Sequence, residues 1–288
     1  LRKVYATARG RARWISCGGV CALTGRATLM HGGWHGRGAG GSSYIGGVVD
    51  SNSKGLITDD CGSGSGTGSC NVGGLVGMNT GTITDGYWNT STTGVSNGVG
   101  LGLNSGASGA TTSALQASLQ TGFSTTTWGI NAGVSYPYFK WRFPSGPSVI
   151  SGAVTGVSGG NGSLGLSAAV DGTVVATAHT GANGYNNMMV DTQAGKSEVL
   201  PWLDGTRFAG GTVTARGSAL GVTSFAGQAL GLDIRAGDIS HTGTETSLSV
   251  LASAFATAKG SLSDPNILYS VTSGQFTPDK DAGVWFDM

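Results

Sequence analysis

Short apolar segments separated by glycine and asparagine recur along the first half of the chain. Residues 44–59 read YIGGVVDSNSKGLITD, and residues 71–85 repeat the pattern as NVGGLVGMNTGTITD. A fixed period of roughly 20 to 50 residues is typical of solenoids, in which each coil stacks on the one before it. The pattern therefore predicts β-coils over residues 44–110. Apolar side chains should point inward, and Gly or Asn should occupy corners with a positive φ angle.

The two copies align residue by residue. Val49 lies 27 positions before Val76 and, after the loss of one residue, Ile57 lies 26 positions before Ile83. We therefore expect Val49 to stack on Val76 and Ile57 on Ile83. Two coils cannot bury a stable core by themselves, so further coils are expected to flank them in a longer parent protein. The chain does not open with Met, and we interpret it as a fragment.

A different pattern occupies residues 111–147, which we name the closing segment. Ser113 is expected to cap a short helix in which Leu115 and Leu119 share one face at i, i+4 spacing. Aromatic residues then follow and are expected to cluster over the open end of the solenoid: Trp128, Tyr136, Tyr138, Phe139 and Trp141. The same cluster also fits a sugar-binding platform, but its alternation with Gly and Pro favours the structural interpretation.

The chain after Pro147 alternates between β-like runs and turn residues. Asp171-Gly172, between two alternating runs, is a strong hairpin signal. The pattern predicts a β module over residues 148–230, similar to the small β-sandwiches of immunoglobulin or transthyretin-like kind found as stalks on surface proteins. Its predicted strands include residues 149–155, 164–170, 173–179 and 211–217.

Helical spacing occurs in the C-terminal segment 231–288. Leu248, Leu251, Phe255 and Ala258 recur on one helical face, with a serine before them and a glycine after them. This pattern predicts an amphipathic helix of about three turns that packs against a sheet.

Composition supports a mainly β chain. Glycine supplies 54 residues, 39% of residues are hydrophobic and only 11% are charged. Six prolines and the lack of an every-third-residue glycine period exclude collagen, and the hydrophobic content argues against wholesale disorder. No run of about 18 apolar residues is present, so no transmembrane helix is expected.

Basic residues concentrate at the start of the chain. Residues 1–49 hold seven basic side chains and no acidic one. Residues 1–43, which we name the head, show no period, and we expect them to be poorly ordered. A shifted reading frame, which the codon table permits, and a native basic head are both open explanations. Binding of nucleic acid or a membrane is disfavoured, because the head has no basic helical stripe and no aromatic platform.

Cysteine and histidine spacing offers two candidate sites. The head contains a C-x3-C-x9-H-x3-H pattern formed by Cys17, Cys21, His31 and His35. Zinc accepts such ligands, but the central spacer is shorter than the usual length of about 12 and lacks the apolar residues of a zinc finger. A bridge between Cys61 and Cys70 is the second candidate, although Cys61 occupies the repeat position of Tyr87. No metal or cofactor is therefore expected.

Other motifs match catalytic patterns by composition alone. Ser96 lies in a G-x-S-x-G match, but a nucleophile elbow needs a strand before the serine and a helix after it. The G-x-G-x-x-G match at residues 36–41 also has no strand before it and no helix after it. His179 and His241 are isolated and are interpreted as ordinary surface histidines. The sequence therefore predicts no catalytic residue.

The phrase VGGLVGMNTGTI resembles the GLUG repeat of filamentous-haemagglutinin-like, two-partner-secreted bacterial adhesins. The run DGYWNTSTTG, together with the aromatic residues of the closing segment, is similar to the end of such arrays, and the resemblance covers residues 44–150. It implies a right-handed parallel β-helix, a secreted protein at the bacterial cell surface and an outer-membrane secretion partner. It also implies adhesion to glycans or proteins of host or bacterial surfaces.

These patterns predict a mainly β chain with a parallel β-helix fragment, a small β-sandwich and one or two short helices. The expected function is that of a non-enzymatic, structural and adhesive segment of a large secreted surface protein. Two alternatives stay open. One is a passive repeat or stalk region of an exported peptidase or other secreted enzyme whose catalytic domain lies elsewhere. The other is a degenerate reading frame without a present function.

Overall fold

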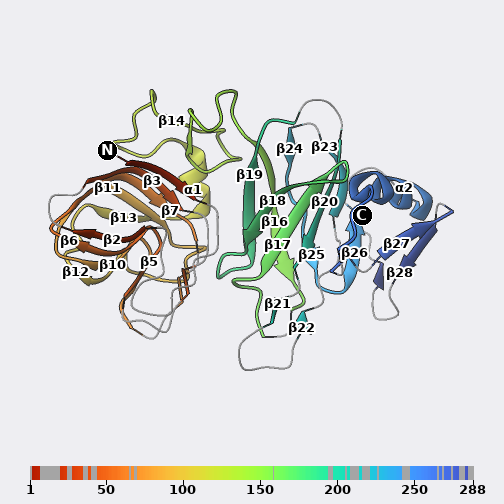
Figure 1. Ribbon diagram of the computed structural model, residues 1–288, viewed down its shortest axis with the longest axis horizontal. Coiled ribbons are helices and arrows are strands. Elements are labelled where there is room, and N and C mark those ends of the chain that lie inside the picture. Colours follow the sequence, from red (N-terminus) through yellow and green to blue (C-terminus); the bar gives the residue numbers. More distant parts are fainter. Residues whose placement is uncertain are drawn as a thin grey trace. The chain divides into compact units, whose positions relative to one another are not determined.

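The computed structural model is mainly β, with two helices among the residues that it describes (Figure 1). It divides into two compact units, Leu1–Gly146 with Gly181–Asn183, and Pro147–Thr180 with Gly184–Met288. The described residues are 2–6, 20–24, 28–34, 38–39, 44–64, 66–67, 70–157, 159–193, 197–204, 206–207, 214–215, 221–225, 227–241, 247–264, 266–267, 269–273, 275–278 and 283–284.

The first unit is built mainly from parallel strands (Figure 1). Its five-stranded sheet has the order β1 (Arg2–Ala6), β3 (Thr28–Trp34), β7 (Leu56–Gly62), β11 (Thr82–Asn89) and β13 (Ala107–Ala110). Its four-stranded sheet has the order β12 (Val99–Gly102), β10 (Val76–Asn79), β6 (Val49–Ser53) and β2 (Val20–Thr24). Short pairs join β4 (Gly38–Ala39) to β8 (Gly66–Thr67), β5 (Ile45–Gly46) to β9 (Val72–Gly73), and β14 (Trp128–Gly129) to β15 (Tyr138–Phe139).

The two sequence repeats stack in register. Val76 pairs with Val49 where β10 lies beside β6, and Ile83 pairs with Ile57 where β11 lies beside β7. All four residues are buried. The spacing of 27 and then 26 residues predicted these pairs, and the structure confirms them.

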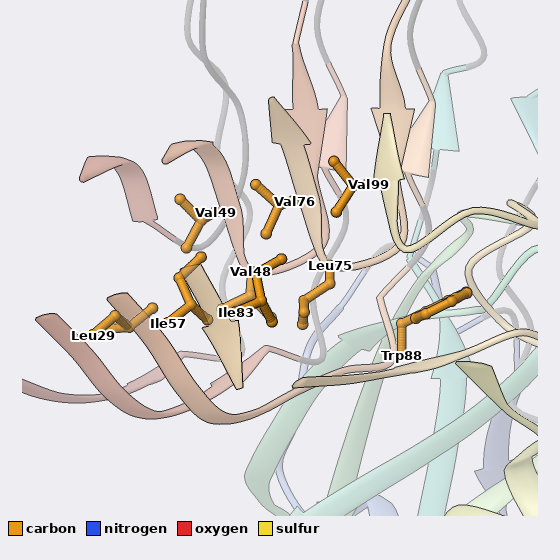
Figure 2. Close-up of a cluster of buried hydrophobic side chains, with 9 residues drawn as sticks. All are labelled: Leu29, Val48, Val49, Ile57, Leu75, Val76, Ile83, Trp88 and Val99. Atoms are coloured by element: carbon orange, nitrogen blue, oxygen red, sulfur yellow. The ribbon is translucent and has the colours of Figure 1, made fainter. Parts of the chain in front are cut away.

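Equivalent side chains form rows in the core of this unit. Figure 2 shows two such rows, one of Leu29, Ile57 and Ile83 and the other of Val49, Val76 and Val99. Val48, Leu75 and Trp88 complete the cluster. Because each row takes one residue from each strand, the core grows by a fixed increment with every repeat.

Strands of the head join both sheets, which the sequence did not predict. β2 pairs with β6, β3 pairs with β7, and β1 pairs with β3. Leu29 in β3 is buried beside Ile57. Parallel pairing uses main-chain groups, so it does not require the side-chain pattern of the repeats to recur in the head. The prediction of a poorly ordered head also concerned residues 7–19, 25–27, 35–37 and 40–43, which lie outside the described residues.

A left-handed backbone residue recurs at one level of the five-stranded sheet. Asp59 has a φ of 56° and Asp85 one of 50°, and Gly106 has a φ of 83°. Each lies directly before a residue of one row that runs across the sheet. In this row Gly86 pairs with Asp60 on one side and with Ala107 on the other. Aspartate tolerates this region better than most residues do. Asp thus fills two corners for which Gly or Asn was expected.

Main-chain atoms of the same and of the neighbouring repeat crowd around the Gly-Gly pairs. A Cβ on Gly73 would collide with the carbonyl oxygen of Val76 and lie 2.7 Å from the nitrogen of Gly100. A Cβ on Gly46 would collide with the carbonyl oxygen of Val49 in the same way. Neither glycine has a left-handed φ, so space rather than backbone freedom requires glycine here.

The second unit contains two main sheets and a helix (Figure 1). One sheet has the order β19 (Tyr185–Val190), β16 (Ser148–Thr155) and β24 (Gln228–Ala229), and β25 (Ile234–Arg235) also pairs with β16. The six-stranded sheet has the order β18 (Thr173–His179), β17 (Gly165–Val170), β20 (Ser197–Leu203), β23 (Gly221–Phe225), β26 (Asp238–His241) and β29 (Gly283–Val284). Shorter pairs join β21 (Thr206–Arg207) to β22 (Thr214–Ala215) and β27 (Tyr269–Thr272) to β28 (Gln275–Pro278).

The predicted hairpin is present at the edge of the six-stranded sheet. β17 and β18 pair antiparallel, and Asp171 and Gly172 between them have φ angles of 47° and 75°. Two positive φ angles are typical of the type I′ turn that such a sequence favours. The segment 211–217, also predicted as a strand, is described only at β22.

The two sheets share a core but depart from a purely antiparallel sandwich. Ile150 of β16, Val170 of β17 and Met188 of β19 belong to one buried cluster. β16 pairs parallel with β24 and β25, and β23 pairs parallel with β26. An immunoglobulin sandwich is built from antiparallel sheets, so these parallel additions differ from that expectation.

The C-terminal helix α2 (Leu248–Lys259) forms where helical spacing predicted it. Ser247 caps its first turn and Gly260 follows its last residue. Its buried face packs in a cluster with Trp202 of β20 and Tyr269 of β27, and includes Leu251, Ala252, Phe255 and Ala258. Leu248 was expected on this face but is exposed, because it lies in the first turn, ahead of the buried residues.

We predict that Gly73→Ala destabilises the first unit by about 3 kcal/mol, because the added methyl group has no room between two main chains. The measurement is a chemical denaturation curve followed by circular dichroism. The matched control is Gly133→Asn, at a φ of 75° with nothing within 4 Å of the new Cβ. An unchanged midpoint for Gly73→Ala would contradict the close approach.

Candidate functional site

Two buried asparagines form a polar ladder between coils. The Asn52 amide nitrogen donates to the Asn79 side-chain oxygen at 2.8 Å, and the Asn79 amide nitrogen donates to the Leu103 carbonyl at 2.7 Å. Each asparagine oxygen also accepts a main-chain N–H, from Gly55 at 3.0 Å and from Gly81 at 3.1 Å. The ladder therefore satisfies corner groups that the strands leave without a partner.

A third buried asparagine connects β11 to the closing segment. The Asn89 amide nitrogen donates to the hydroxyl oxygens of Thr112 and Tyr136, each at 2.9 Å. Its side-chain oxygen accepts the N–H groups of Ser91 at 2.8 Å and Thr92 at 3.2 Å. One amide thus fixes both the turn after β11 and the start of the closing segment.

The closing segment contains a stack of four aromatic rings. Ring centroids are 4.5 Å apart for Phe123 and Trp128, 4.1 Å for Trp128 and Phe139, and 5.8 Å for Phe139 and Trp141. The first three are buried, whereas Trp141 is 51% exposed. Tyr87 of β11 meets Phe123 edge-on at 5.6 Å. The predicted aromatic cluster is thus confirmed, and Phe123 is a member that the sequence did not reveal.

The other predicted aromatic residues, Tyr136 and Tyr138, are buried. The aromatic cluster contacts Tyr87 and Asn89 on β11. Leu101 and Leu103, at the end of the stack, stay exposed. The cluster therefore contacts β11 and leaves Leu101 and Leu103 uncovered, and its place over the open end of a solenoid stays a prediction.

The short helix of the closing segment differs in its details from the prediction. α1 spans Thr112–Ala117, and its cap is Thr111, whose hydroxyl accepts the Ala114 N–H at 3.2 Å. Ser113 lies inside the helix, so the prediction of Ser113 as the cap was wrong. Leu115 is buried as expected, but Leu119 lies beyond the end of the helix.

One regular surface among the described residues of the first unit is the outer face of β7, β11 and β13. We define this outer face as Thr58, Thr82, Thr84, Tyr87 and Ser108. Thr84 pairs with Thr58, and Tyr87 pairs with Ser108. Thr82, Thr84 and Ser108 are exposed. Hydroxyl groups in register on a flat sheet can make many weak hydrogen bonds to a partner surface.

Tyr87 is the titratable group of this face. Its hydroxyl donates to the Thr121 carbonyl at 3.1 Å. Partial burial raises its pKa, and the nearby carboxylates of Asp85 and Asp59 raise the pKa further. The phenol therefore stays protonated at neutral pH, and the outer face has hydrogen-bonding rather than nucleophilic character.

Cys61 and Cys70 are both free thiols, so the candidate bridge between them is not formed. Cys61 pairs with Tyr87 in the sheet, which confirms that the two share a repeat position. Cys61 is buried and Cys70 is exposed. Burial raises the pKa of the Cys61 thiol to about 12, and the neighbouring Asp60 carboxylate contributes.

The structure places Ser96 in an exposed turn ahead of β12. A strand, not a helix, follows it, and β11 ends seven residues before it at Asn89. This is not the geometry of a nucleophile elbow. His179 ends β18 and His241 ends β26, so the two histidines lie on different strands.

Metal-ligating groups do not converge within the described residues, where no cluster of three or more His, Cys, Asp or Glu is found. Cys17 and His35 of the candidate zinc set lie outside those residues, as does most of the 36–41 match. Cys21 lies in β2 and His31 lies in β3. In the same described residues, neither helix is long and apolar enough to cross a membrane.

Comparison with known proteins identifies no relative. No protein-family model matches the chain, and no curated protein or solved structure does so. The resemblance of the repeats to adhesin sequences therefore stays a prediction.

We predict that Asn79→Ala destabilises the first unit by about 1 to 3 kcal/mol, because it removes the buried hydrogen bond from the Asn52 amide and two part-buried bonds, to the Gly81 N–H and the Leu103 carbonyl. Thermal or chemical unfolding of the full chain measures the loss. Asn104→Ala, in an exposed turn, is the control and should leave stability unchanged. Equal stability of the two variants would show that the ladder contributes little.

We predict that Cys61 resists thiol reagents in the folded protein, because only the thiolate reacts. The Cys17→Ser, Cys21→Ser double variant leaves Cys61 and Cys70 as its two thiols. In this variant Cys70 should react rapidly at pH 8, and Cys61 should react only after denaturation. Because the pKa of Cys61 is raised in the folded state, the free energy of unfolding depends on pH. The contribution of Cys61 is fully present below the ordinary pKa of 9.0 and is lost as the pH rises toward about 12. A Cys61→Ala variant should lack this alkaline loss, and rapid reaction of both thiols would contradict burial.

Proposed function

We propose that this chain is a non-enzymatic, structural and adhesive segment of a large secreted bacterial surface protein. In this proposal the first unit is a right-handed parallel β-helix, and the second unit is a β-sandwich spacer. Secretion through an outer-membrane partner and location at the cell surface rest on the resemblance of residues 44–150 to adhesin repeats.

The observation that carries the proposal is the in-register stacking of repeat-equivalent residues. Val49 with Val76, and Ile57 with Ile83, put equal side chains at equal heights in successive coils. Stacked coils of this kind give length and rigidity, which a surface stalk needs. The Asn52–Asn79 bond supports the same role, because it links neighbouring coils inside the core.

The outer face supports adhesion by distributed contact. Its hydroxyl groups lie in register on β7, β11 and β13, and Thr82, Thr84 and Ser108 are exposed. A surface of this type binds its partner through many weak contacts spread over the sheet, and it does not need a pocket. Affinity then rises with the number of coils and copies that engage together.

We predict that beads coated with the full chain adhere to cultured epithelial cells or to bacterial cells better than beads coated with serum albumin. A Thr82→Lys, Thr84→Lys double variant should reduce this adhesion roughly fivefold or more, because it places two large cations on the outer face. The matched control is Thr173→Lys with Val174→Lys, an exposed pair on β18 of the second unit. Bead counts under a microscope measure the effect.

Two results would overturn the proposal. Equal adhesion of chain-coated and albumin-coated beads on both cell types would remove the adhesive role and favour a passive stalk. Hydrolysis of ester or peptide substrates that Ser96→Ala abolishes would make the chain an enzyme.

A further inference from the structure

The parallel stack ends in two strands whose outer edges are open. β12 is the last strand of the four-stranded sheet, and β13 is the last strand of the five-stranded sheet. Among the described residues, no strand pairs with the outer edge of either. The outer edge of a strand presents main-chain N–H and C=O groups that can pair with another chain.

Among the described residues, the chain does not supply a further strand at this end. Thr111 caps α1 directly after β13, and the chain then runs to contacts with Tyr87 and Asn89 on β11. Residues 101–106 are all exposed. They include two large apolar side chains, Leu101 at 46% and Leu103 at 60% exposure.

This edge also lacks the usual protection against pairing. Residues 99–110 read VGLGLNSGASGA and contain no charged residue and no proline. Proteins commonly protect exposed edge strands with lysine, proline or other charged side chains. At the opposite end of the stack, by contrast, the sequence places Arg2 and Lys3 in β1. An identical uncharged edge can therefore approach β12 and β13 without electrostatic repulsion.

We propose that this end of the stack, formed by β12, β13, Leu101 and Leu103, is a self-association surface for a second copy of this chain. The two copies are related by a two-fold axis, so that β12 of one pairs antiparallel with β12 of the other. Leu101 and Leu103 of each copy are covered by the other. A two-fold contact of this kind closes as a dimer and does not extend into a fibre.

The proposal predicts that the full chain, kept reduced so that thiols cannot cross-link, forms a dimer in sedimentation equilibrium over a micromolar concentration range. A Leu101→Lys, Leu103→Lys variant should raise the dimer dissociation constant by roughly a hundredfold, because like charges then face each other across the axis. The matched control is Leu230→Lys with Leu248→Lys, two exposed leucines of the second unit. This control should dimerise as the unmodified chain does.

Mixing two oppositely charged variants tests the dimer in a way that distinguishes lost association from lost folding. A Leu101→Glu, Leu103→Glu variant should be monomeric alone, and its mixture with the lysine variant should restore a dimer of one copy of each. A second pair of changes, Leu101→Ser with Leu103→Ser, should weaken the dimer while leaving the circular dichroism spectrum unchanged. A monomeric unmodified chain, a dimer indifferent to the lysine variant, or assemblies longer than dimers would each overturn the proposal.

Discussion

The first unit depends on how closely successive main chains approach at the Gly-Gly corners. A Cβ on Gly47 would collide with the Gly74 carbonyl oxygen, and one on Gly74 would collide with the Trp88 ring. This approach permits the same hydrogen-bond pattern in two successive coils. Val48 and Val49 both donate to the Leu75 carbonyl, at 2.8 and 3.0 Å, and Leu75 and Val76 both donate to the Gly98 carbonyl at 2.9 Å. Because the Gly-Gly pairs of the two repeats lie side by side, the inward side chains that follow them, Val49 and Val76, also lie side by side.

The polar ladder follows from the same geometry. Where the chain turns between strands, main-chain groups such as the buried Gly55 N–H and the Leu103 carbonyl are not paired by the strands. Asn52 and Asn79 bind them, and an amide can do so because it carries both donors and an acceptor. A charged side chain at these positions would be costly to bury.

Local patterns determined how much of the structure could be predicted. The stacking of Val49 on Val76 was predictable because equal inward side chains recur at a fixed spacing, and α2 was predictable because its periodicity and its caps agree. The pairing of β2 with β6 and of β3 with β7 was not, since main-chain hydrogen bonds do not require a repeated side-chain pattern. The cap at Thr111 was mistaken for Ser113 because both hydroxyl residues precede the same apolar residues. The parallel pairing of β16 with β25 joins segments about eighty residues apart, a distance over which no local pattern acts.

Parallel strand pairing has no stop within its own chemistry, because the last strand of a sheet offers the same kind of main-chain edge as every strand before it. Termination must therefore come from a segment with a core of its own. The closing segment has one, since Phe123, Trp128 and Phe139 bury their rings against each other. Its contacts with the parallel sheets include those to Tyr87 and Asn89 on β11. The closing segment thus packs beside β11 while, among the described residues, no strand covers the edges of β12 and β13, and Leu101 and Leu103 stay exposed.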